Sequence, residues 1–439
     1  MNKKIEITKE YQDALDLIKK DKNVFINGSG GVGKSEFLKY FVNTTKKEYA
    51  VVAPTGVAAI NLGENVAAET IHRFFGFGID VTYENAKPHG LKLSTLRALQ
   101  VLIIDEISMV KADMMDCIDK VLKKAKESPE PFGGVQLVVF GDLLQLSPIV
   151  RKDEKKFYEE KYDSEYFYDS KICKKLPFET IEFTKIFRQS NEDFKNILNR
   201  IRFGEHTQND IDILNTRVTW SNNNEKAIVI CMINRDVDKI NDTQLSKIDL
   251  TSKTYTADYS YGFNPRNAPC DEIIELKVGA RVMCVANDTE NNEFYNGLLG
   301  NVVELKKESV VVTYDNGNTV EMGQHEWNAF KASYDSETKT LKHNADGSFK
   351  QIPLKLAWAI SVHKSQSKTF DNIFIKLMGG IGSFATGQMY VALSRATNIE
   401  GIALSAKLKM DSIKTDKRVV KYLRKPTQET LMDLDELSN

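Results

Sequence analysis

At 439 residues, the chain is long enough for about two to four ordinary domains with a large buried core. Its 41% hydrophobic and 28% charged residues are typical of a soluble globular protein, and no apolar run approaches the roughly 20 residues that span a bilayer. The net charge of −1 argues neither for nor against nucleic acid, so any basic groove must be local.

The five cysteines lie far apart in the sequence and include no C-x-x-C pair. This spacing indicates neither a zinc site nor a disulfide framework. The first residues, MNKKIEITKEYQDAL, lack the apolar core of a signal peptide. We therefore expect a cytoplasmic protein in a reducing compartment, with no membrane partner.

A helix is predicted over residues 5–20, because apolar side chains recur near one face and Thr8 is a suitable N-cap. Gln12 lies on this helix, just upstream of a glycine-rich segment. It is either a surface glutamine, which the spacing alone favours, or a residue whose amide reads the edge of an adenine.

The glycine-rich segment 28–35 follows a short apolar run and precedes an amphipathic stretch. Its spacing, G-x-x-x-x-G-K-S, predicts a phosphate-binding loop at a helix N-terminus, with Lys34 reaching the β- and γ-phosphates and the Ser35 hydroxyl on Mg²⁺. A glycine turn with a solvated lysine is the simpler alternative, which the flanking strand and helix disfavour. The candidate nucleotide-binding residues are Gly28, Gly30, Gly31, Val32, Gly33, Lys34 and Ser35.

A second buried strand is predicted at 51–53, which places Thr55 and Gly56 at its tip, where α/β sheets bind ligands. The following stretch, 70–78, mixes aromatic, basic and glycine residues and suits a nucleic-acid contact. His72 and Arg73 are its candidates for phosphate. The phenylalanines are expected in the core, with Phe77 retained as a DNA candidate.

Residues 79–94 lose clear periodicity and contain Pro88 and Gly90, which marks a loop or a small insertion. This segment is either a wedge that separates strands or only a connection.

An apolar strand at 101–104 ends in Asp105 and Glu106. Downstream of a phosphate loop, this pair predicts an ATPase site in which Asp105 holds hydrated Mg²⁺ and Glu106 polarises the attacking water. A strand at 135–140 then ends before Gln145, which is either a γ-phosphate sensor or a turn amide. The strand ends together predict a RecA-like core.

The charged, tyrosine-rich segment 151–177 is expected to be irregular or helical surface structure. The next apolar stretch, 181–187, leads to Arg188, which is either a surface arginine or an arginine finger at the start of a second lobe.

A second α/β pattern begins with a helix over 193–202 and a strand over 227–232, and short β-type runs fill 246–352. The pattern resumes with a strand over 354–360, followed by a basic, hydroxyl-rich loop suited to a phosphodiester backbone. Residues 388–397 are expected to form a helix that presents Arg395. The loop candidates for DNA contact are His363, Lys364, Ser365 and Thr369.

The ordered motifs resemble the petite-integration-frequency (PIF) group of superfamily-1 B-type DNA helicases of bacterial or phage type, relatives of RecD and Dda. The resemblance covers Gln12 to about residue 406. It is carried by GSGGVGKS, APTGVAA, TIHRFFGF, IIDEISM, PFGGVQLVVFGDLLQLSP, FTKIFRQ, HKSQSKT and YVALSRA.

The fold that this resemblance implies is α/β, with two RecA-like parallel-sheet lobes. Residues 1–75 and 95–185 would form lobe 1A, with a wedge insertion 1B at 76–94. Residues 186–245 and 353–425 would form lobe 2A, with an SH3-like β-barrel insertion 2B at 246–352. Residues 426–439 would be an acidic tail.

The resemblance also implies an ATP- and Mg²⁺-dependent helicase that moves 5′→3′ on single-stranded DNA and unwinds duplex, forked or G-quadruplex DNA, as a monomer in a bacterial or phage-infected cell. Roles in DNA repair, recombination and telomere maintenance accompany the family. By position, Gln12 would sense adenine, Gln145 would sense the γ-phosphate, and Arg188 and Arg395 would be the two arginine fingers. The positions that would lie near the DNA strand are Thr55, His72, His363, Lys364, Ser365 and Thr369.

Two residues depart from the family pattern. Ser367 stands where glycine is usual, and Ser147 where proline is common. Because serine lacks glycine's access to positive φ, the geometry of the 363–369 loop and its coupling to DNA are in question.

Two other functions fit the same motifs. One is a DNA-stimulated ATPase that remodels protein–DNA complexes without unwinding, which a forked-duplex assay would distinguish. The other is a nucleotide-dependent switch with no motor, in which Arg188 and Arg395 would not affect turnover.

Overall fold

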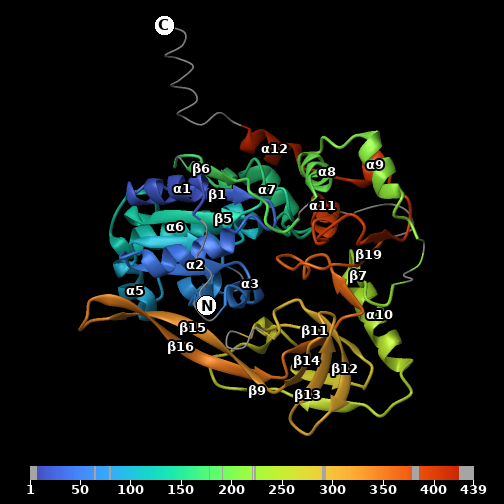
Figure 1. The fold of residues 1–439 in the computed structure, drawn as a ribbon. Helices are drawn as coiled ribbons and strands as arrows, with labels where there is room; N and C mark the ends of the chain where they lie inside the picture. The colour runs from blue at the N-terminus through green and yellow to red at the C-terminus, as the bar shows by residue number, and fades with distance from the viewer. Residues whose placement is uncertain are drawn as a thin grey trace.

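The computed structural model describes residues 7–63, 66–78, 81–176, 178–189, 191–219, 221, 224–288, 293–377 and 385–424. The predicted acidic tail and two residues of the predicted wedge, 79 and 80, lie outside these ranges. Figure 1 shows two α/β lobes side by side, with a β-rich insertion below them.

The first lobe is built on a six-stranded parallel sheet of order β3-β2-β4-β5-β1-β6. Register pairs such as Phe25 with Val139 place the carboxyl ends of the strands at one edge. Those ends carry the predicted motifs. The strands are β1 (Val24–Gly28), β2 (Tyr49–Ala53), β3 (Ala68–Thr70), β4 (Val101–Ile104), β5 (Gln136–Gly141) and β6 (Glu179–Phe183).

Helices cover both faces of this sheet, because alternate strand residues point to opposite sides. Phe25 and Val139 enter one buried cluster, and Ile26 and Val138 enter the other. The predicted cap is confirmed, since Thr8 accepts a hydrogen bond from the Tyr11 amide at 3.3 Å. The helices are α1 (Lys9–Lys19), α2 (Lys34–Thr44), α3 (Gly56–Asn61), α4 (Ile71–Phe75), α5 (Leu93–Ala98), α6 (Ala112–Lys126) and α7 (Lys155–Lys161).

The second lobe has a smaller parallel sheet of order β18-β7-β19-β20. Two parallel-sheet lobes confirm the expected fold class. The predicted helix over 388–397 is too long, because it ends at Leu393 and Arg395 follows it. The elements are α8 (Glu192–Phe203), α9 (Gln208–Asn215), β7 (Ile228–Cys231), α10 (Asn234–Ser246), β18 (Ala359–Ser361), β19 (Ile373–Lys376), α11 (Gln388–Leu393) and β20 (Ile402–Leu404).

The insertion is β-rich, as predicted, and contains a five-stranded antiparallel sheet, β14-β13-β12-β11-β17. The single strand predicted over 354–360 is wrong. Leu354 pairs with Cys284 of the insertion, whereas Ala359 pairs with Val229 of the second lobe. The strands are β8 (Lys253–Thr256), β9 (Asp258–Tyr259), β10 (Ile273–Leu276), β11 (Arg281–Cys284), β12 (Leu299–Leu305), β13 (Val310–Tyr314), β14 (Thr319–Met322), β15 (His325–Asp335), β16 (Thr340–Gln351) and β17 (Leu354–Leu356).

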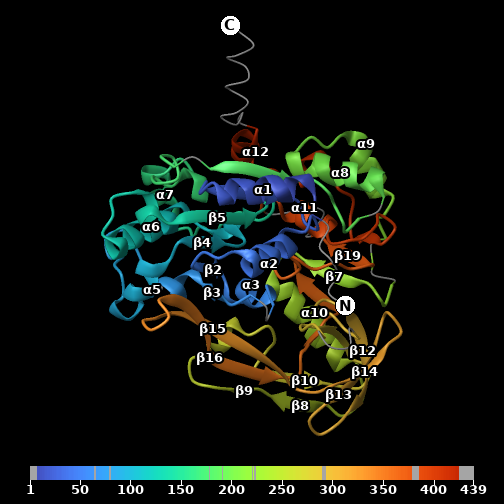
Figure 2. The ribbon, with the colours of Figure 1, turned by 60° about the vertical axis from the view of Figure 1, so that its left-hand side comes forward.

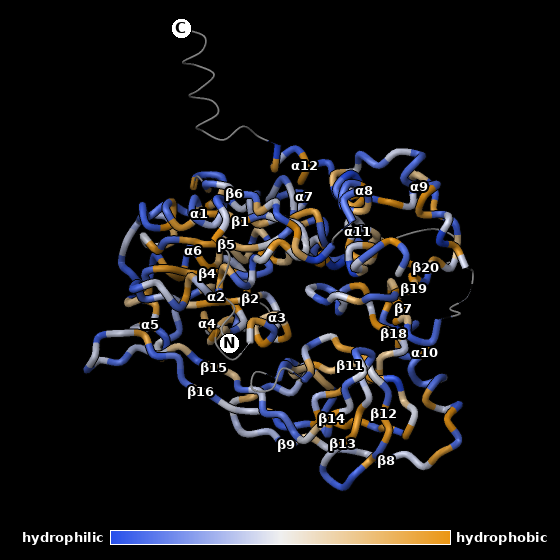
Figure 3. The backbone as a smooth tube through the Cα atoms, in the orientation of Figure 1, coloured by the Kyte–Doolittle hydropathy of each residue, from blue (hydrophilic) through white to orange (hydrophobic). Residues whose placement is uncertain are grey.

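The long hairpin β15–β16 leaves the insertion and lies along the first lobe (Figures 1 and 2). The buried Glu69 accepts a hydrogen bond from the Ala332 amide at 2.6 Å. Arg73 donates to the Asp346 carboxylate at 2.7 Å. Figure 3 shows the hairpin as mostly hydrophilic, and its Ala332 and Leu341 pack in the apolar cluster of the first lobe.

Segment 151–177 is partly core, which corrects the expectation of surface structure. Tyr166 and Phe167 are fully buried, and Tyr168 stacks on Tyr422 with ring centroids 3.9 Å apart. Tyr422 lies on α12 (Lys417–Leu423), so this last helix packs on the first lobe although it was expected with the second.

The five cysteines are all free and buried. None of the helices in the described part of the chain has the length and apolar character that a membrane crossing requires.

Candidate nucleotide site at the lobe interface

The glycine-rich loop joins β1 to α2 at the carboxyl edge of the first sheet. Gly31 and Gly33 have φ values of +89° and +84°, which glycine adopts without strain. The Lys34 ammonium donates to the carbonyls of Gly28 at 2.7 Å and Ser29 at 3.0 Å. Burial lowers the pKa of Lys34, while the carboxylates of Asp142 and Glu106 act in the opposite direction. The lysine is thus held over the loop, at the start of a helix that favours anions.

Tyr11 is a residue at this loop that sequence reasoning did not single out. Its hydroxyl donates to the Gly33 carbonyl at 3.0 Å, and a Cβ on Gly33 would lie 2.1 Å from that hydroxyl. The close approach explains why glycine is needed there. The neighbouring Gln12 is exposed and donates to Asp16 at 2.9 Å, so its contact with adenine stays a prediction.

Asp105 and Glu106 directly follow β4, as predicted. Loss of solvent and the neighbouring Glu106 raise the pKa of Asp105 from 3.8 to about 7. Glu106 has φ +50° and ψ +45°, a left-handed conformation that costs a non-glycine residue about 1–3 kcal/mol. Such backbone strain is concentrated at functional sites, which supports a catalytic part for Glu106.

A buried polar network at the end of β5 was missed by the sequence analysis. Asp142 is 1% exposed and accepts hydrogen bonds from Gln145 at 3.2 Å, Arg202 at 3.1 Å and Tyr390 at 3.3 Å. Arg202 and Tyr390 come from the second lobe, so Asp142 joins the lobes and orients Gln145. The sequence offered one signal for Asp142, because this carboxylate directly follows an apolar strand, as Asp105 does.

Arg188 and Arg395 meet at the phosphate loop. A Cβ on Gly30 would lie 2.9 Å from Arg188 Nη1 and 3.0 Å from Arg395 Nη2. Arg395 is fully buried, and burial together with Arg188 lowers its pKa to about 9. Within the described ranges both guanidinium groups donate to carbonyl or hydroxyl oxygens, such as Ser394 O at 3.2 Å and Val391 O at 2.8 Å, rather than to carboxylates. Two adjacent cations at the phosphate loop are suited to an anion.

The loop between β18 and β19 presents only some of its DNA candidates. His363 and Lys364 are exposed, and Thr369 is half-buried. Ser365 is fully buried and its hydroxyl donates to the Val362 carbonyl at 2.8 Å. The Ser365 hydroxyl therefore holds the loop together here, and its contact with DNA has no support in this arrangement.

The remaining DNA candidates lie on the first lobe beside the insertion. Thr55 is exposed and caps α3, whereas Gly56 is buried against Asn267. His72 is half-buried, and burial lowers its pKa. Phe74 and Phe75 are core residues, as expected, and Phe77 is half-buried with its ring stacked on Phe75 at 5.4 Å. Because Arg73 is paired with Asp346, its phosphate contact stays a prediction.

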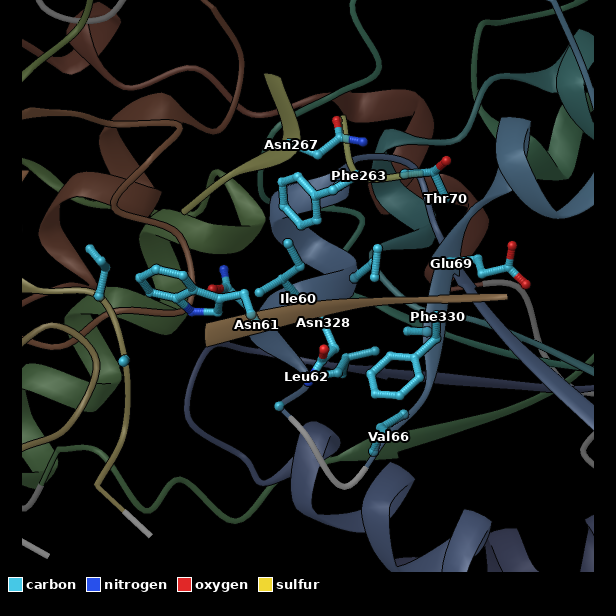
Figure 4. Close-up of a pocket in the computed structure, with 18 of the residues that line it drawn as sticks. Ile60, Asn61, Leu62, Val66, Glu69, Thr70, Phe263, Asn267, Asn328 and Phe330 are labelled. Carbon is cyan, nitrogen blue, oxygen red and sulfur yellow. The ribbon is translucent and has the colours of Figure 1, made fainter. Parts of the chain in front are cut away.

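A pocket of about 210 Å³ separates this part of the first lobe from the insertion. In Figure 4, Ile60, Leu62 and Val66 of the first lobe lie opposite Phe263 and Phe330 of the insertion. Both polar and apolar residues line this pocket, and Gly56 and Thr70 are among them.

Comparisons with known proteins agree with this geometry. The model of the PIF1-like helicase family matches residues 6–212. The ATP-dependent DNA helicase Pif1 of Bdellovibrio bacteriovorus is 30% identical over 411 residues, which are 91% of this chain and 88% of that protein. PIF1 of Xenopus laevis is 33% identical over 92% of this chain, but the chain spans only 62% of that longer protein.

Solved structures agree over almost the whole length. Bacteroides sp Pif1 in complex with ADP-AlF4 has a TM-score of 0.87 at 37% identity, covering 96% of this chain and 97% of that one. The Bacteroides Pif1 bound to single-stranded DNA has a TM-score of 0.68 over the same shares. The sequence match, the two-lobed fold and the loop with its paired arginines lead to one conclusion: the chain belongs to the PIF1-like helicase family.

Proposed function

We propose that this chain is an ATP-dependent DNA helicase that moves 5′→3′ on single-stranded DNA and unwinds duplex, in the cytoplasm of a bacterial or phage-infected cell. The observation that carries this proposal is the meeting of Arg188 and Arg395 at Gly30. Both arginines follow the first lobe in sequence, and Arg395 belongs to the second lobe, so γ-phosphate between them would tie lobe closure to nucleotide state.

The donor set at the loop fits a magnesium ion. The Ser35 hydroxyl and the Asp105 carboxylate are hard oxygen donors, which this ion prefers. Ser35 and Asp105 would hold the magnesium ion, which would supply positive charge against the phosphates. Asp105 would have to be ionised to hold it, and its raised pKa makes this step depend on pH.

The remaining residues have separate tasks in hydrolysis. Lys34 would exchange its loop carbonyls for phosphate oxygens. Glu106 would orient the attacking water and accept its proton, while Gln145, held by Asp142, would register the γ-phosphate. Arg188 and Arg395 would stabilise charge that develops on the transferred phosphoryl group. Loss of that group would remove the link between the lobes and let them open.

Magnesium-dependent nucleotide binding is expected to weaken about tenfold from pH 8 to pH 6, because Asp105 with a pKa of about 7 must release its proton first. The raised pKa of Asp105 also means that the folded state keeps a proton on this carboxyl that the unfolded state loses between about pH 4 and pH 7. The free energy of unfolding of the nucleotide-free protein should therefore fall as the pH rises through this range. Titration with fluorescent ADP and magnesium at both pH values measures the first effect. Asp105→Asn should remove the pH dependence, and an equal dependence in that variant would contradict this account.

DNA binding is expected to use phosphate contacts from the exposed end of the β18–β19 loop. Lys364→Ala should lower the affinity for single-stranded DNA about three- to tenfold and reduce the slope of log K against log salt by about 0.7, the share of one phosphate contact. Fluorescence anisotropy across a salt series measures both. Lys307→Ala, at an exposed lysine of the β12–β13 turn, is the matched control. An unchanged slope in Lys364→Ala would remove this lysine from the DNA path.

Unwinding itself is tested with forked duplexes that carry a single 5′ or 3′ tail, and with a G-quadruplex after a 5′ tail. We expect unwinding from the 5′ tail by a monomer, with residues 76–94 acting as the wedge. ATP hydrolysis stimulated by single-stranded DNA without any unwinding would favour the alternative, a translocase that remodels protein–DNA complexes. Hydrolysis without DNA stimulation would leave only a nucleotide switch.

A further inference from the structure

The loop 362–369, between β18 and β19, touches two catalytic candidates of the first lobe. The Ser367 hydroxyl donates to Glu106 Oε1 at 3.3 Å. The adjacent Gln366 donates to Gln145 Oε1 at 3.3 Å. Neighbouring residues of one loop therefore contact both the acid that would polarise water and the amide that would sense the γ-phosphate.

The same loop also holds the buried arginine and touches the insertion. Arg395 Nη1 donates to the carbonyls of Ser365 at 3.2 Å and Lys368 at 3.3 Å. The Lys368 ammonium donates to Asn296 of the insertion. Because Lys364 of this loop is exposed, a phosphate bound there acts on a segment that already contacts three catalytic candidates.

Ser367 reaches Glu106 through an unusual backbone. Its φ is +60°, in the left-handed region that serine adopts rarely, and Glu106 also has a left-handed φ of +50°. The sequence left open whether serine at position 367 could adopt the positive φ of a glycine. Ser367 does adopt it in this structure. Unlike glycine, it adds a hydroxyl. A donor on one carboxylate oxygen fixes the direction of Glu106 and occupies an acceptor position that the attacking water would otherwise use.

We propose that Ser367 is a positioning residue that restrains Glu106 in the DNA-free protein and so keeps ATP turnover low until DNA is bound. The inference rests on the proposed ATPase function. DNA phosphate at Lys364 would shift the loop, break the 3.3 Å contact and free the carboxylate to accept a proton from water. The 3.3 Å length suits a contact that breaks readily.

The test compares Ser367→Ala, Ser367→Gly and Ser367→Asn by ATP turnover, without DNA and with saturating oligodeoxythymidylate. Alanine and glycine lack the hydroxyl and should raise the DNA-free kcat about three- to tenfold, the worth of one hydrogen bond. The KM for ATP and the DNA-saturated kcat should stay within about twofold of the parent. Asparagine tolerates positive φ and offers an amide donor, so it should restore the low DNA-free rate.

Two control variants separate this effect from general changes in the protein. Ser246→Ala removes an exposed hydroxyl that donates to the Thr243 carbonyl of its own helix, and Lys339→Gly relaxes a left-handed residue, φ +56°, in the hairpin turn. Both should match the parent. A DNA-free kcat that is unchanged or lowered in Ser367→Ala and Ser367→Gly overturns the inference, and so does an equal rise with saturating DNA. Failure of the proposed function gives a different result: DNA would then not stimulate the ATP turnover of the parent protein.

Discussion

Glu106→Gln is expected to lower DNA-stimulated ATP turnover by about 10²- to 10⁴-fold, because an amide cannot accept the proton of the attacking water. The substitution keeps the shape of the side chain and leaves Lys34 and the loop glycines in place. Binding of ADP and of single-stranded DNA should therefore remain close to that of the parent. Steady-state turnover, fluorescent-ADP titration and DNA anisotropy measure the three quantities.

A matched control for this substitution exists in the same lobe. Glu127 also has a left-handed backbone, with φ +54°, and lies at the end of α6, where its side chain pairs with Arg97. Glu127→Gln should retain full turnover. If Glu106→Gln keeps more than about a tenth of the parent's kcat with DNA, Glu106 is not the general base.

Arg395→Lys is expected to lower kcat by about 10³-fold, at the lower end of the effect of an arginine finger. Lysine keeps the charge, but it cannot donate to Val391 and Ser365 while reaching the phosphate loop. Arg188→Lys should also lose turnover. Turnover with saturating DNA and the KM for ATP measure the loss, which we expect mainly in kcat because transition-state charge is affected.

Because Arg395 is fully buried, its replacement also tests the fold. Thermal unfolding of the variant shows whether the second lobe remains intact. Arg217→Lys is the matched control, since Arg217 donates to the Ile402 carbonyl at 3.0 Å in the same lobe, outside the nucleotide site. Parent-like turnover in a folded Arg395→Lys protein would refute the finger and favour a switch without a motor.

Much of the nucleotide site was predictable because its parts are contiguous. The loop at 28–35, the pair Asp105–Glu106 and the cap at Thr8 depend on local spacing, and apolar strands followed by polar residues place such motifs at one sheet edge. The expected two-lobed α/β fold and the family follow from the same motifs. The domain limits and the wedge remain predictions.

The errors arose where distant segments decide the structure. The run 354–360 reads as one apolar strand, but its two halves pair with different sheets. The tyrosine-rich segment 151–177 reads as surface, but α12 covers it from the far end of the chain. Local pattern reports how apolar a segment is and cannot report which partner buries it.

The sequence by itself therefore determined the class of the fold and predicted the chemistry of the nucleotide loop, because backbone cradles and sheet edges are encoded by residues close together in the chain. Only the tertiary structure decided which side chains meet across the lobes. Asp142 and Tyr390 lie 248 positions apart in the chain, and Ser367 and Glu106 lie 261 positions apart. Such pairs form when the lobes and the insertion pack together, and no local spacing encodes that packing.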